Sequence, residues 1–144
     1  MAFTKSRFYP KRPIRSFRDL EVYQRTFKNS VDVIKKIVPA MQGKEYPLRD
    51  QIIDCCLIIP NLVAESHGRR FDEKEKSYKL LEEAMTQCNK MVVYLEQARD
   101  IFSSEIDKFV VEELIKNYIL TRTKIFNLLK AWKKYQYYDK NAPK

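Results

Sequence analysis

The sequence predicts an all-α protein, an antiparallel up-down-up-down four-helix bundle with flexible basic termini. Along four segments the apolar residues recur at spacings of three and four, which is the period of an amphipathic helix. Glycine occurs only at Gly43 and Gly68, so a long helix would break at few places. The 144 residues suit one domain, and four helices with short links pack side by side, each antiparallel to the next.

The first two helices follow from their apolar stripes and their prolines. We expect the first helix from Leu20 to Pro39 and the second from Pro47 to Gly68. Pro47 suits a first helical position because its missing N–H would have no partner there. Pro60 interrupts the second helix and predicts a kink. The predicted inward residues are Leu20, Tyr23, Phe27, Val31, Ile34 and Val38, then Leu48, Ile52, Cys55 or Cys56, Ile59, Leu62 and Val63.

The other two helices are expected to start at side-chain caps. Asp72, with Glu75 three residues later, has the form of a capping box, and the third helix should end near Ile101. Ser103 or Ser104 is expected to cap the fourth. The predicted inward residues are Leu81, Met85, Cys88, Val92 and Leu95, then Val110 or Val111, Leu114, Tyr118, Thr121 or Arg122, Ile125, Leu128 or Leu129, Trp132 and Tyr135.

Positive charge gathers at both ends of the chain. We expect a basic N-terminal arm (1–16), the bundle (17–136) and a basic C-terminal tail (137–144). The first eighteen residues hold six basic side chains and no acid, and Lys116 to Lys144 hold eight against the single Asp139. The antiparallel order brings both termini to one end, while Asp100, Glu105 and Asp107 lie at the other. Such a positive end indicates a polyanionic partner.

Aromatic residues lie among these basic residues, which is a pattern typical of proteins that bind unpaired bases. Lysines can neutralise phosphates while exposed rings stack on bases. The expected nucleic-acid-binding residues are Lys5, Arg7, Lys11, Arg12, Arg15, Arg18, Arg69, Arg70, Lys130, Lys133 and Lys134. The alternative stays open that Trp132 and Tyr135 close the core or an oligomer seam, and that the lysines are a solvated face.

The sequence offers little for catalysis. His67 is the only histidine, and neither a phosphate-binding glycine loop nor zinc-ligand spacing is present in it. We interpret Cys55, Cys56 and Cys88 as reduced packing residues. We therefore expect no enzymatic activity, no metal and no cofactor. Glu65, four residues before Arg69, is expected to form a surface ion pair or, less simply, a contact across a subunit interface.

The membrane and targeting signals are also missing from the sequence as given. The longest uncharged stretch, Cys55 to Ala64, falls far short of the ~20 residues of a spanning helix. An apolar run does not follow the first basic residues. We expect a cytoplasmic protein.

Two segments, Phe17–Tyr23 and Ile59–Glu65, carry a family resemblance. They resemble the four-helix bundle proteins encoded by intervening sequences in bacterial large-subunit ribosomal RNA genes. The matching residues are Phe17, Asp19, Leu20, Ile59, Pro60, Ala64 and Glu65. Related in fold are the accessory variability determinants of diversity-generating retroelements, which form pentameric rings and bind nucleic acid together with a reverse transcriptase. The resemblance implies a homo-oligomer, suspected to be a pentamer, with nucleic acid and a reverse transcriptase or another protein as partners.

The sequence leads to one function and two alternatives. The first is a non-enzymatic bundle that binds RNA or DNA, largely independently of sequence, as an accessory to a reverse transcriptase or ribonucleoprotein. The second is a protein-interaction or scaffolding module without a direct nucleic-acid role. The third, attachment to anionic membrane surfaces through Phe3 to Phe17, ranks last.

Overall fold

The computed structural model describes residues 14–43 and 47–141, with side chains described as far as Tyr135. Four long helices make up most of it: α1 (Glu21–Lys36), α2 (Pro47–Arg69), α3 (Lys74–Ile101) and α4 (Lys108–Asn141). Two short 3-10 helices, η2 (Phe17–Asp19) and η3 (Val38–Met41), flank α1. The described residues contain no strand, which confirms the all-α prediction.

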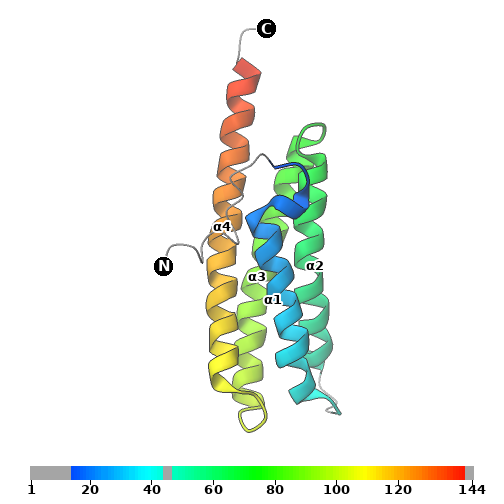
Figure 1. The fold of residues 1–144 in the computed structure, drawn as a ribbon, viewed down its shortest axis with the longest axis vertical. Helices are drawn as coiled ribbons and strands as arrows, with labels where there is room; N and C mark the ends of the chain where they lie inside the picture. Colours follow the sequence, from blue (N-terminus) through cyan, green and yellow to red (C-terminus); the bar gives the residue numbers. More distant parts are fainter. Residues whose placement is uncertain (1–13, 44–46, 142–144) are drawn as a thin grey trace.

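The helices form a bundle in which each one contacts its neighbour along the chain, and α1 also contacts α4. Figure 1 shows the start of α1, the α2–α3 turn and the carboxyl end of α4 toward the top. The α1–α2 and α3–α4 links lie at the bottom. We call these the upper end and the lower end of the bundle. The carboxyl end of α4 extends past the α2–α3 turn (Figure 1).

The core follows the predicted stripes and decides between their alternatives. Val111, Thr121 and Leu129 are buried, whereas Arg122 is exposed, and Cys55 and Cys56 are both buried. Between α1 and α4 a buried hydrogen bond joins Asn29 Nδ2 to Thr121 Oγ1 at 3.1 Å. Buried polar groups need such partners, so this pair fixes the register of the two helices.

Two residues predicted to face inward do not. Phe27 is 52% exposed, because it lies on the flank of α1 instead of its centre. Tyr135 is 68% exposed and lies near the carboxyl end of α4. Residues 137–141, expected to lie in the basic C-terminal tail, continue the helix.

The helix starts differ most from the predictions. Asp72 does not cap α3: the N-cap is Glu73, and it makes no side-chain capping bond. At α4, Asp107 Oδ1 accepts from the Val110 N–H at 3.2 Å, so the predicted serine caps are wrong. A capping box that the sequence reading missed lies at η2, where Ser16 and Asp19 satisfy each other's backbone N–H groups.

Pro39 and Pro60 occupy two different kinds of position. α1 ends at Lys36, and Pro39 lies in η3 after it. α2 continues through Pro60, whose ring is buried. The kink predicted at Pro60 stays a prediction.

The three cysteines are free and buried in the middle of the bundle. Burial raises the pKa of the Cys55 thiol to about 11 and those of Cys56 and Cys88 to about 12. The fully buried Tyr118 has its pKa raised by burial and by these thiols. The three cysteines are therefore buried packing residues, as predicted.

Truncating the core tests the packing. Leu81 is fully buried on α3 and Leu120 is 43% exposed on α4. We expect Leu81→Ala to lower the free energy of unfolding by about 2 to 5 kcal/mol, because it leaves a cavity. Leu120→Ala should change it by about 0.5 kcal/mol or less. Urea unfolding followed by circular dichroism measures both, and equal losses would contradict the assigned core.

Candidate nucleic-acid interface

A long stretch of α4 carries positive charge without acids of its own. Between Leu114 and Tyr138 the sequence holds no aspartate or glutamate. Lys130, Lys133 and Lys134 are exposed there. Because the end of α4 extends past the α2–α3 turn (Figure 1), part of this basic segment stands clear of the other helices.

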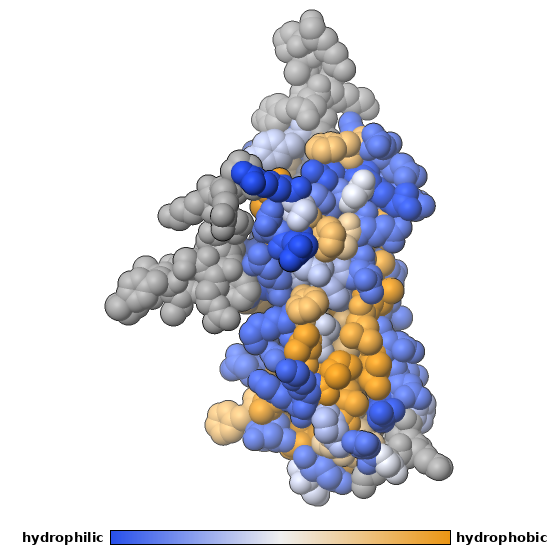
Figure 2. Space-filling view, turned by 45° about the vertical axis from the view of Figure 1, so that its right-hand side comes forward, coloured by the Kyte–Doolittle hydropathy of each residue, from blue (hydrophilic) through white to orange (hydrophobic). Residues whose placement is uncertain are grey.

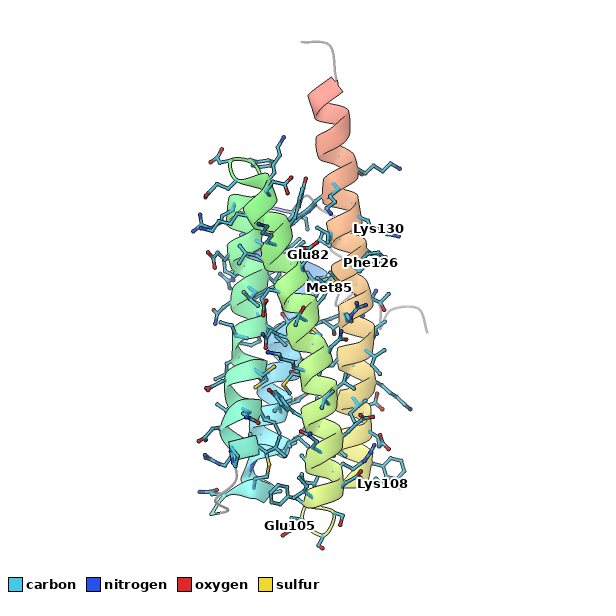
Figure 3. All side chains as sticks on the ribbon, turned by 180° about the vertical axis from the view of Figure 1, so that it is seen from behind. Glu82, Met85, Glu105, Lys108, Phe126 and Lys130 are labelled. Atoms are coloured by element: carbon cyan, nitrogen blue, oxygen red, sulfur yellow. The ribbon has the colours of Figure 1, made fainter. Side chains whose placement is uncertain are left out.

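Two of these lysines lie over aromatic rings. Lys130 Nζ lies 5.0 Å from the centroid of the Phe126 ring, and Lys133 Nζ lies 5.2 Å from that of Tyr78 on α3. Figure 3 shows Phe126 and Lys130 on α4 beside Glu82 and Met85 of α3. Cations near ring faces are attracted by the ring quadrupole. The surface therefore presents positive charge and aromatic area together.

His67 and Trp132 close the upper end of the core. Their ring centroids are 6.3 Å apart, and His67 Nε2 is buried without a hydrogen-bond partner in the described structure. Arg70 donates to the His67 carbonyl at 2.5 Å, and its Nη1 lies 3.2 Å from His67 Nδ1. Burial and then the Arg70 charge lower the pKa of His67, while Asp19 opposes this shift. His67 is a neutral packing residue.

Arg69 is held between two carboxylates. Its Nε lies 3.1 Å from Glu65 Oε2, which confirms the ion pair predicted from the spacing, and its guanidinium also contacts Glu73. Both contacts raise the pKa of Arg69. The charge of Arg69 is therefore offset within the chain, and it adds less to the positive end than the sequence suggested.

The start of α1 adds two cations. Arg15 and Arg18 are exposed, and Asp19 Oδ2 accepts from the backbone N–H of Arg15 at 2.9 Å. Phe17 packs edge to face on Tyr23, with centroids 4.9 Å apart. This local packing and the Ser16 cap hold the segment against the bundle. The remaining predicted contacts of the arm, Lys5, Arg7, Lys11 and Arg12, lie outside the described residues.

The lower end has the opposite character. Arg99 Nε lies 2.9 Å from Asp100, and its Nη1 lies 3.3 Å from Glu112. The bond from Arg99 is the main reason why the pKa of Asp100 lies below its ordinary value. Glu105 and Asp107 are exposed nearby. The bundle is thus basic at the upper end and richer in acids at the lower end.

The structure brings together the predicted site residues that it describes. These are Arg15, Arg18, Arg69, Arg70, Lys130, Lys133 and Lys134, and all lie toward the upper end. Sequence reasoning missed three exposed lysines in the first turns of α3: Lys74, Lys76 and Lys79. Their close spacing in the sequence could have indicated a basic cluster. Asp72 and Glu73 just before them and Glu75 among them offset that charge, so the cluster was not recognised.

The family-motif residues mostly support the fold. Ile59, Pro60 and Leu20 are buried, and Ala64 is half-buried. Glu65 is exposed and pairs with Arg69.

Two kinds of site can be examined directly. Across 14–43 and 47–141, histidine, cysteine and carboxylate side chains do not gather in a group of three that could hold a metal ion. The helices described here are also too polar or too short to cross a membrane. Comparison with protein-family models, curated proteins and solved structures found no match to this chain. The family resemblance therefore stays a prediction.

The burial of His67 makes stability depend on pH. Its pKa in the folded state lies below the ordinary 6.5, so the unfolded chain binds more protons as the pH falls through about 6.5. We expect the unfolding free energy to fall between pH 7.5 and 5.5, and to fall less in His67→Gln. Urea unfolding at a series of pH values measures this, and equal pH slopes in the two proteins would contradict it.

Proposed function

We propose that this protein is a non-enzymatic helical bundle that binds RNA or DNA through its upper end. The observation that carries the proposal is the stretch of α4 between Leu114 and Tyr138, which holds no acid, with Lys130, Lys133 and Lys134 exposed toward the upper end. Arg15 and Arg18 lie at the same end. Phosphate groups release counterions when such cations neutralise them, which favours binding.

The aromatic residues of this end suit unpaired strands. Phe126 is 43% exposed and Tyr135 is 68% exposed, and both lie on α4 among the lysines. Exposed rings stack on bases of any sequence. The described part of the surface lacks a helix with asparagine, glutamine and arginine set to read base edges, so recognition would follow the backbone and the strand rather than the sequence.

The proposal includes the finer predictions made from the sequence. These are the antiparallel up-down-up-down order, assembly into a homo-oligomer, a cytoplasmic location and a role as accessory to a reverse transcriptase or ribonucleoprotein. The order is supported by the position of the helix links in Figure 1. The pentamer and the reverse transcriptase are supported by the family resemblance alone.

Charge reversal on α4 tests the phosphate contacts. We expect Lys130→Glu/Lys133→Glu to weaken binding to single-stranded and duplex oligonucleotides and to reduce the slope of log K against log salt by roughly 1.4 to 1.8. Fluorescence anisotropy over a salt series measures both. The control is Lys36→Glu/Lys108→Glu, which reverses two exposed lysines toward the lower end and should bind normally. Wild-type protein that fails to bind at low salt would reject the function.

An aromatic substitution tests stacking separately from charge. Tyr135→Ala should cost about 1 to 3 kcal/mol of binding to single-stranded RNA or DNA, with a smaller effect on duplex. Phe109→Ala is the matched control, since Phe109 is 89% exposed near the start of α4, at the lower end. Equal anisotropy titrations for the two variants would show that Tyr135 does not stack on bases.

A protein-interaction module remains the second candidate. It is favoured by the exposed apolar side chains outside the upper end, such as Phe27 and Leu57. It predicts weak, non-saturating association with oligonucleotides and a stable complex with an acidic protein partner. The same anisotropy titrations, together with co-purification from the native host, separate the two functions.

A further inference from the structure

The outer face formed by α1 and α2 carries an apolar strip. α1 faces α4 with Glu21 and Asn29, which contact Lys124 and Thr121. Phe27, Val31 and Ile34, three or four residues apart, therefore lie on the other flank of α1, next to α2. Phe27 is 52% exposed, and Val31 and Ile34 are half-buried.

α2 continues this strip. It faces α3 with Cys55, whose Sγ lies 3.2 Å from Gln87 Oε1. Ile53 and Leu57 lie on the opposite flank, next to α1, and Leu57 is 45% exposed. Figure 2 shows the resulting apolar area on the lower part of the molecule. Exposed apolar areas of this kind mark interaction sites.

Charges of opposite sign border the two sides of the strip. Lys35 lies on the α1 side, four residues after Val31, and is exposed. Asp50 and Asp54 lie on the α2 side, seven and three residues before Leu57, and both are exposed. All three lie close to the α1–α2 link, so they are at similar heights along the bundle.

We propose that this face binds the same face of a second copy of the chain, around a two-fold axis parallel to the helices. That axis places α1 of one subunit against α2 of the other, so Lys35 meets the partner subunit's Asp50 and Asp54, twice per dimer. A two-fold axis perpendicular to the helices would place α1 against α1 and α2 against α2, so Lys35 would not meet these carboxylates, and this axis is disfavoured. The pattern therefore favours a pair over the five-membered ring that the resemblance implies.

The size of the face is sufficient for a dimer. α1 has 16 residues and is about 24 Å long, and two neighbouring helices are roughly 20 Å wide, so two such faces bury roughly 1,000 Å² in total. This is close to the smallest area of a specific interface. The exposed apolar residues of α4 are less suitable, because Glu113 and Lys116 separate Phe109 from Ile119 and Leu120.

The axis also has a consequence for the proposed function. It keeps the two bundles parallel, so both upper ends point in the same direction. A single strand could then contact two basic ends at once, which raises its affinity by linking two sites. This consequence rests on the proposed function, whereas the dimer itself does not.

A charge exchange between two variants tests the dimer, with sedimentation velocity on the full chain over a concentration series and without nucleic acid. We expect Lys35→Glu alone to raise the dimer Kd about tenfold or more, because it creates like-charge contacts, and Asp50→Lys/Asp54→Lys alone to do the same. An equimolar mixture of the two variants should restore dimers, since both contacts are then attractive again.

Apolar substitutions complete the test. Leu57→Glu should give monomers with an unchanged helical circular-dichroism signal, whereas Phe109→Glu should leave the dimer intact. The proposal is overturned by a wild-type protein that is monomeric at every concentration, by a mixture that does not restore dimers, or by an assembly that survives Leu57→Glu. A monomer that still binds oligonucleotides through Lys130 and Lys133 would reject the dimer and retain the proposed function.

Discussion

The unequal lengths of the helices determine how this molecule presents its charge. α3 ends and α4 begins at the lower end, where a short link joins them. α4 has 34 residues and α3 has 28, so α4 is about 9 Å longer at 1.5 Å per residue. Its last turns therefore cannot be covered by α3 or by the shorter α2. Lys130, Lys133 and Lys134 lie toward this end, within a stretch that holds no acid, and all three are exposed to solvent.

The upper end of the core is sealed by packing and hydrogen bonds rather than by charge. His67 packs against Trp132, and Ser77 Oγ donates to the Ser66 carbonyl at 2.8 Å across the α2–α3 turn. Arg69 is engaged by Glu65 and Glu73. The residues at the end of α2 therefore hold α4 in place by packing, and the charge of Arg69 there is offset by its two carboxylate partners. This separates the residues that hold the site in place from those that would contact a polyanion.

Hydrophobic periodicity predicted the four helices and most of the core, because burying an apolar stripe is the main reason that each helix forms. It could not decide helix starts. Several residues near each start can cap, and tertiary packing selects among them: Asp107 caps α4 instead of Ser103 or Ser104, and Ser16 forms a box with Asp19 that the stripe did not indicate. Periodicity also could not separate the centre of a stripe from its edge, so Phe27 was assigned to the core. The basic site residues of α4 could be predicted from the sequence of charges alone. The neutralisation of the Arg69 charge could not, because it depends partly on Glu73, which lies after the end of α2.

The three buried cysteines give the molecule a further property. With pKa values of about 11 to 12, Cys55, Cys56 and Cys88 are thiolate in only about one molecule in ten thousand or fewer at neutral pH. Because the thiolate is the reactive form, oxidants and alkylating reagents would have to wait for the bundle to open. Chemical damage at sulfur would then depend on how often the bundle opens, so a less stable bundle would lose its thiols faster.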